Sequence, residues 1–177
     1  MPQAATHIII TLIAASIIRD FYAGKNKFPL HYVFIAGLAG LLPDLDITAY
    51  WILNFFGFAL NEVHRTFTHT LFLPALFLIL AFLAGEYSFK AFGKRHMTLR
   101  GIFLMIAFGS FMHLVLDASL AGLIRPFYPV SNFAVGFSII AYLPDRLKNL
   151  FFPCLDAALL VIWLVYLELK HKISDCI

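Results

Sequence analysis

The chain has 177 residues, of which 62% are hydrophobic and only 13% are charged, and its formal net charge is +3. An ordinary soluble domain is about half apolar and about a quarter charged, so this composition excludes water as the main solvent and predicts an integral membrane protein. The positive charge is small, and the basic residues lie in short loops without interleaved aromatic residues, so we expect no nucleic-acid partner.

Five apolar segments are long enough to cross or enter a bilayer, in which a spanning helix needs about 20 residues. In chain order they cover 4–18, 31–60, 67–85, 101–124 and 151–169. The second segment is interrupted by a proline beside two carboxylates, in Leu42-Pro43-Asp44-Leu45-Asp46, and such a sequence ends or kinks a helix. No linker or long charge run divides the chain. The sequence therefore predicts an all-α fold, a polytopic membrane helical bundle of about five membrane elements with a broken second helix, in a single integral membrane domain over 1–177.

The loops on the two sides of this bundle differ in their basic residues. One side collects Arg19, Lys25, Lys27, Lys90, Lys94, Arg95, Arg100, Lys170 and Lys172, and the other collects only Arg65, Arg125, Arg146 and Lys148. Cytoplasmic loops carry the excess of lysine and arginine. We therefore expect the N-terminus and the loops 60–66 and 125–150 to lie outside the cytoplasm.

Ionisable side chains within the apolar segments are the first candidates for a functional site, because a charge inside a membrane is costly. Seven ionisable residues in or beside these segments are the candidates, His7, Asp44, Asp46, His64, His69, His113 and Asp117. His31, His96 and His171 lie beside basic or loop residues, and we expect them to be solvated. Because successive elements alternate in direction, all seven are expected at one end of the bundle, whichever face is cytoplasmic. The orientation above then places the site on the non-cytoplasmic face.

The local spacing of these residues allows more than one interpretation. His113 and Asp117 are four residues apart and share one helical face, where they suit a metal ion or a hydrogen bond that fastens two helices. His64 and His69 are five residues apart, so we expect His64 to project from a loop. The two aspartates of the break are suited to a cation, but an acidic turn at the membrane edge has the same sequence.

The combination of imidazole and carboxylate without thiolate suits zinc, manganese, iron or magnesium in a hydrolytic role. Two such ions can share a bridging carboxylate and activate a water molecule. Arg65 and Arg125 are expected at the same face, where a guanidinium is well shaped to hold a phosphate. Ordinary snorkelling of arginine at a membrane surface is the alternative for both.

Five motifs follow one another along the chain, His7, Leu42-Pro43-Asp44-Leu45-Asp46, His64-Arg65-Thr66-Phe67-Thr68-His69-Thr70, His113-Leu114-Val115-Leu116-Asp117 and Arg125-Pro126-Phe127. Over roughly residues 4–130 they resemble the YdjM family of inner-membrane, metal-dependent hydrolases. Their order is also distantly similar to the zinc-dependent phospholipase C and single-strand nuclease superfamily, whose further His-x-x-x-Asp or Glu pair is missing here. The resemblance implies one or two metal ions, zinc or manganese, rather than three. The ligands that it implies are His7, Asp44 or Asp46, His64 or His69, His113 and Asp117.

The resulting hypothesis is a multi-pass hydrolase of the inner membrane that cleaves a phosphoester such as a phospholipid or a lipid-linked phosphate. In it, Asp44 or Asp46 bridges the metals or acts as base, while Arg65, Thr68 and Arg125 orient the substrate. Two alternatives remain open, a divalent-cation transporter and a structural membrane protein in which His–Asp pairs fasten helices. The sequence does not predict the oligomeric state.

Overall fold

The computed structural model describes residues 4–23, 28–85, 87–90 and 96–172, and most of these residues are helical. The elements in chain order are α1 (Ala4–Ile17), the π-helical η1 (Ile18–Ala23), α2 (Leu30–Ala39), η2 (Pro43–Leu45), α3 (Asp46–Leu53), η3 (Asn54–Phe56), α4 (Leu60–Val63), α5 (Phe72–Leu83), β1 (Ser88–Lys90), β2 (His96–Thr98), α6 (Leu99–Leu116), the π-helical η4 (Asp117–Ala121), η5 (Ile139–Tyr142) and α7 (Asp145–His171).

Three helices in the described part of the chain are long and apolar enough to cross a membrane, Ala4–Tyr22, Leu99–Leu120 and Asp145–Lys170. A fourth candidate is a pair bent by 45°, made of α2 and the helical residues Pro43–Phe56. The helix α5 is apolar but has only 12 residues, against the roughly 20 that span a bilayer. The number of about five membrane elements is therefore not confirmed, and the structure supports three or four.

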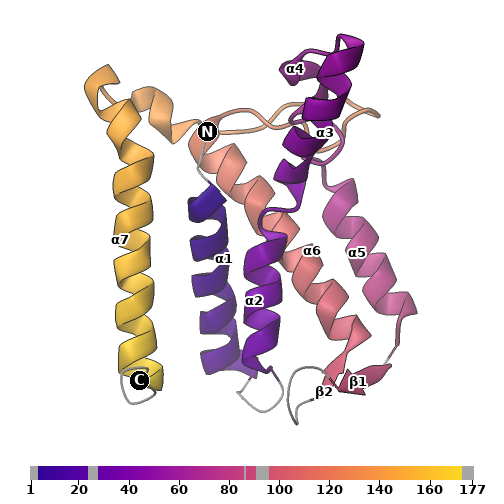
Figure 1. Ribbon diagram of the computed structural model, residues 1–177, viewed down its shortest axis with the longest axis vertical. Coiled ribbons are helices and arrows are strands. Elements are labelled where there is room, and N and C mark those ends of the chain that lie inside the picture. Colours follow the sequence, from indigo (N-terminus) through magenta and orange to yellow (C-terminus); the bar gives the residue numbers. More distant parts are fainter. Residues whose placement is uncertain (1–3, 24–27, 86, 91–95, 173–177) are drawn as a thin grey trace.

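The five longer helices stand in a row, α7, α1, α2, α6 and α5, in which each contacts the next (Figure 1). The short helices α3 and α4 lie at the end of the bundle where α1 begins and α2 ends. The hairpin β1–β2 lies at the opposite end of the bundle. The departures from an all-α fold among the described residues are this hairpin and an isolated antiparallel bridge between Ile124 and Val135. The hairpin pairs Ser88 with Thr98, and the Thr98 hydroxyl then caps α6 by accepting a hydrogen bond from the backbone of Gly101.

Small residues allow α2 and α6 to approach each other closely. A Cβ atom on Gly109 of α6 would overlap the backbone oxygen of Ala36 and contact Ala39 on α2. Close packing through small residues is typical of helices in membranes, where lipid provides no hydrophobic drive for association. This approach brings the end of α2, at Gly40, against the last turn of α6.

The predicted break of the second helix is confirmed. The helix α2 ends at Ala39, and the chain continues through turns into η2, which begins at the buried Pro43. Because proline lacks an N–H group, it starts a helical turn more readily than it continues one. The break places Asp44 within η2 and Asp46 at the first position of α3.

The expected orientation remains a prediction. Four of the basic residues on which it depends, Lys25, Lys27, Lys94 and Arg95, lie outside the described residues.

Candidate metal centre

The structure brings all seven ionisable residues together at one end of the bundle, although they come from separate elements. His7 lies in the first turn of α1, His113 lies in the last turn of α6, and Asp117 is the first residue of η4. His64 and His69 lie in the loop between α4 and α5. Asp44 is half-buried and the other six are buried. Whether they bind a metal stays a prediction, which the geometry below supports.

Four side-chain atoms form the centre of this cluster. The Nε2 atom of His69 lies 3.2 Å from His113 Nε2, 3.4 Å from Asp44 Oδ1 and 3.5 Å from Asp117 Oδ2. The Nε2 atom of His113 lies 3.5 Å from Asp44 Oδ1 and 3.7 Å from Asp117 Oδ2. Ligand atoms bound tetrahedrally at zinc distances are about 3.3–3.4 Å apart. These five distances are close to those of a tetrahedral ligand set, and His69, His113 and Asp117 form one of three groups in the described residues whose atoms could hold a metal ion together.

The second nitrogen of each central imidazole is held by an acceptor. His113 Nδ1 donates a hydrogen bond to the carbonyl oxygen of Gly40 at 2.7 Å. His69 Nδ1 lies 3.2 Å from a carboxylate oxygen of Asp46. Because these oxygens only accept, both Nδ1 atoms carry the proton, and both Nε2 lone pairs face each other across 3.2 Å. Such an arrangement needs a shared cation or proton between the two nitrogens.

His69 lies outside the candidate membrane helices, in the loop between α4 and α5. Burial lowers the pKa of this imidazole, but its contacts with the carboxylates of Asp44 and Asp46 outweigh burial and raise the pKa to about 8. Without a metal ion, a proton on His69 therefore supplies the positive charge that the surrounding carboxylates require.

Asp46 organises the loop that carries the two histidines. One of its oxygens accepts from His64 Nδ1 at 2.8 Å, and the other accepts from the Thr68 hydroxyl at 2.8 Å and the Arg65 backbone N–H at 3.2 Å. Among the described residues, Asp46 belongs to none of the three groups whose atoms could hold a metal together. The geometry thus favours a positioning role for Asp46, which the sequence had placed among the ligands.

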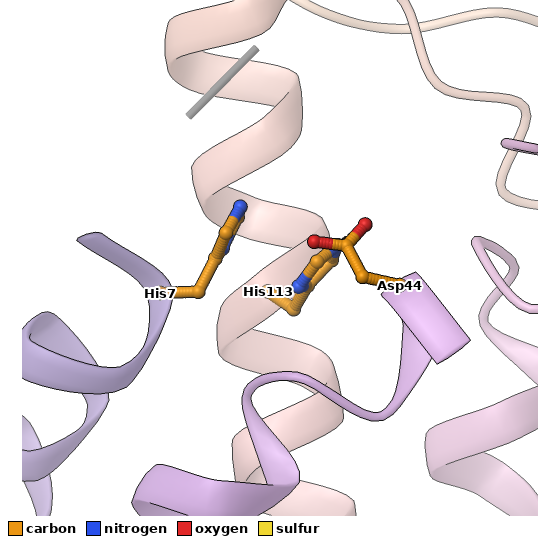
Figure 2. Close-up of side chains that lie close together, drawn as sticks. All are labelled: His7, Asp44 and His113. Atoms are coloured by element: carbon orange, nitrogen blue, oxygen red, sulfur yellow. The ribbon is translucent and has the colours of Figure 1, made fainter. Parts of the chain in front are cut away.

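The other two groups extend the cluster beyond its four central atoms. They are His7 with Asp44 and His113, and Asp44 with His64 and His69. Figure 2 shows His7, Asp44 and His113 pointing toward one another, and the two imidazole rings stack at 3.9 Å. His7 Nδ1 and His64 Nε2 are buried without a hydrogen-bond partner. Asp44 belongs to two of the groups, so it is the carboxylate best placed to be shared by two ions.

Arg65 lies between this cluster and a neighbouring cavity. Its guanidinium is 3.3 Å from Asp117 Oδ2, and its backbone has a positive φ of 63°, a conformation that a non-glycine residue adopts at a cost and that is often found at functional sites. Arg65 and Arg125 line the same cavity of about 660 Å³, together with His64 and Thr66. Thr68 does not line that cavity, because its hydroxyl is turned to Asp46.

Two features of the site were not found from the sequence. The carbonyl of Gly40 orients His113. The small residues that allow this contact were the feature of the sequence that could have indicated it. The Thr6 hydroxyl also donates to the Asp156 carboxylate and ties α7 to α1 beside His7. Asp156 stands in the part of the chain for which no motif was recognised.

The comparisons with known proteins add one finding. The family model described as YdjM inner membrane protein matches residues 1–171, which extends well beyond the motifs at 4–130. The comparisons with curated proteins and with solved structures found no match. The distant similarity to the phospholipase C and nuclease superfamily stays a prediction.

Proposed function

We propose that this chain, which belongs to the YdjM inner membrane protein family, is a multi-pass, metal-dependent hydrolase of a phosphoester such as a phospholipid or a lipid-linked phosphate. One observation carries the proposal. The Nε2 atoms of His69 and His113 lie 3.2 Å apart beside two carboxylates in a buried cluster, and this contact needs a shared cation or proton. This cluster adjoins a cavity lined by two arginines.

The proposed cofactor is one or two divalent ions, with zinc favoured and manganese as the alternative. His69, His113, Asp44 and Asp117 would hold the first ion. His7 would complete a second site with Asp44 and His113, and the alternative second site is His64 with Asp44 and His69. A divalent ion in such a site acts as a Lewis acid and lowers the pKa of a water molecule. A site built only from nitrogen and oxygen ligands is compatible with zinc and with manganese.

The chain's own residues would bind the substrate and handle the proton. Arg65 and Arg125 would hold the phosphate oxygens in the cavity that they share, since a guanidinium pairs with phosphate through two parallel hydrogen bonds. The Asp44 side chain is 21% exposed, whereas those of Asp46 and Asp117 are at most 4% exposed. Asp44 is therefore the most accessible of these carboxylates. In a site with a single ion, its free oxygen would accept the proton of the attacking water, whose oxygen forms the new bond to phosphorus, and would return that proton to the leaving alkoxide.

The proposed location is the inner membrane, with the site on the non-cytoplasmic face. The family description supports the membrane, and the distribution of basic residues supports the face.

A second candidate is transport of a divalent cation. It is supported by the broken helix at Asp44, because interrupted helices carry ion sites in many transporters. The three possible metal groups in the described part of the chain all lie at one end of the bundle, which favours hydrolysis.

The test uses purified, unsoaked protein in detergent. We expect roughly one or two equivalents of bound metal and hydrolysis of p-nitrophenyl alkyl phosphates, which a chelator removes and added metal restores. His113→Ala and Asp117→Ala should each abolish hydrolysis. His31→Ala, in the first turn of α2 at the opposite end, is the matched control and should retain it.

The outcomes separate the alternatives. Metal flux into proteoliposomes that disappears in Asp44→Ala, without hydrolysis, would favour transport. Protein purified without any bound metal would contradict both metal-dependent functions and favour helix fastening.

A further inference from the structure

The loop that carries His64 and His69 lies between two cavities, one lined by arginines and the other lined mostly by apolar side chains. On one side lies the cavity of about 660 Å³ that contains Arg65 and Arg125. On the other side, between α3 and α4, lies a cavity of about 440 Å³ whose walls are mostly apolar. The two cavities share Thr66.

The apolar cavity reaches the metal centre. Leu45, Ala49, Leu53, Phe58 and Phe67 are among its walls, and Asp46 and Thr68 also line it. These two polar residues hydrogen-bond to each other at 2.8 Å, and Asp46 also holds His64. A molecule in this cavity therefore lies one side chain away from the proposed ligands.

The outer surface of α3 and η3 indicates what surrounds this cavity. Trp51, Phe55 and Phe56 are 71%, 90% and 75% exposed. A group of large apolar side chains in water is unfavourable and marks an interaction site, and tryptophan in particular is enriched where a membrane meets water. The helix α3, which carries Trp51, lies at the end of the bundle that holds the site (Figure 1). Membrane lipid is thus the molecule that this cavity meets.

We infer that the apolar cavity between α3 and α4 binds one hydrocarbon chain of a membrane lipid whose phosphate occupies the arginine-lined cavity. The inference rests on the proposed function for the reaction and adds the place where the hydrocarbon chain of the lipid binds. A volume of about 440 Å³ lies within the roughly 300–1,000 Å³ of typical ligand pockets. The loop 64–68 then acts as the divide between headgroup and chain.

A second apolar groove is the rival position for the chain. It has a volume of about 430 Å³ and lies between α5 and α6, where Leu78, Leu104 and Phe108 line it. None of its lining residues is a proposed metal ligand or hydrogen-bonds to Asp46 in the described structure. A chain in this groove would therefore lack the link to the metal centre that Asp46 provides in the α3–α4 cavity.

The test compares two matched substitutions, Ala49→Trp in the α3–α4 cavity and Ala75→Trp in the α5–α6 groove. The probe is a phosphatidic acid with a diazirine in one acyl chain, in detergent micelles. In the native protein, photolysis should label the segment 45–67. Ala49→Trp should reduce this labelling at least about tenfold, as expected when a bulky side chain fills a ligand pocket, and Ala75→Trp should leave it unchanged.

The dependence of KM on chain length gives a second measurement, which can be made on the native protein. With p-nitrophenyl alkyl phosphates from ethyl to hexadecyl, KM should fall by up to about fourfold for each methylene buried, until the cavity is full. Ala49→Trp should raise KM for the long esters and leave the ethyl ester unchanged.

Labelling that is lost in Ala75→Trp instead, or retained in both variants, would overturn the inference, as would a KM independent of chain length. If Ala49→Trp does not fold, the labelled segment and the chain-length series of the native protein still decide. Should no ester be hydrolysed while labelling behaves as expected, the chain site stands and the proposed hydrolysis fails.

Discussion

Substitution of Asp46 by asparagine separates a positioning role from a ligand role. The side chain keeps its size, but the amide has one acceptor oxygen and one donor group where the carboxylate has two acceptors. The carboxylate now accepts hydrogen bonds from His64 Nδ1 at 2.8 Å, from the Thr68 hydroxyl at 2.8 Å and from the Arg65 backbone at 3.2 Å. The donors on one of its two oxygens would therefore face an NH₂ group.

The magnitude follows from the number of contacts that are lost. Loss of the partner that orients a metal-binding histidine typically weakens metal binding by about 10- to 100-fold, which corresponds to about 1.4–2.7 kcal/mol. Because Asp46 orients both His64 and His69, we expect a value near the upper end. Removal of a direct ligand, as in His113→Ala, should instead abolish tight metal binding.

The assay is a competition titration with a chromophoric zinc chelator on detergent-purified protein. Asp145→Asn is the matched control, since this exposed acid at the start of α7 pairs with Lys148 and should leave affinity unchanged. Unaltered zinc affinity in Asp46→Asn would refute the positioning role. Complete loss of zinc, as in His113→Ala, would show that Asp46 is itself a ligand.

Three further predictions follow from the same geometry. His7→Ala should reduce the metal content by one equivalent and leave the ion at the four central atoms, since His7 belongs only to the group with Asp44 and His113. Elemental analysis that finds no change in metal content would contradict a second site. Zinc affinity should fall by about tenfold per pH unit below about pH 8, because the proton of His69 must leave before its nitrogen binds metal. Burial lowers the pKa of His69, but Asp44 and Asp46 raise it further, to about 8. Zinc affinity that is flat between about pH 7 and about pH 8 would contradict this prediction. In a variant without the natural cysteines, a membrane-impermeant maleimide should label Glu62→Cys but not Tyr87→Cys in intact spheroplasts; the reverse pattern would place the site on the cytoplasmic face.

Helix positions were partly predictable from hydropathy, and the differences have physical causes. Hydropathy predicted a third segment beginning at residue 67, whereas α5 begins at Phe72. The residues before it make other hydrogen bonds in place of helical ones. The Thr70 hydroxyl donates locally to Phe67 O, and the Leu71 backbone makes a tertiary hydrogen bond to Pro126 O. Hydropathy cannot detect such competition, because threonine is neither strongly polar nor strongly apolar.

The last helix shows the opposite difference. It was expected from residue 151 but begins at Asp145, directly after Pro144. Proline fixes an extended entry into the helix and the aspartate interacts favourably with the positive end of the helix dipole. A helix start of this kind adds polar residues to an apolar segment, so a search for apolar residues alone misses it.

The convergence of the seven ionisable residues was predictable because it requires only that successive elements alternate in direction. The roles within the cluster were not predictable, because they depend on which nitrogen of each imidazole faces inward. In the sequence, Asp44 and Asp46 are equivalent carboxylates two residues apart. In the structure, the turn of η2 and the start of α3 direct Asp44 to the Nε2 atoms of His69 and His113 and Asp46 to the Nδ1 atoms of the loop histidines.

The same detail bears on the simplest alternative, in which His113 and Asp117 only fasten helices. Both residues stand on one helical stretch, Leu99–Leu120, so fastening requires a hydrogen bond from one of them to another helix. His113 makes such a bond through Nδ1, whose proton it donates to Gly40 within the close contact of α2 and α6, and its Nε2 lies 3.7 Å from Asp117 Oδ2, beyond hydrogen-bonding distance. The helices are thus fastened through a backbone carbonyl, and the inward nitrogen keeps its lone pair directed at a second imidazole. A side chain that served only to join helices would not need that lone pair, whereas a metal ligand does.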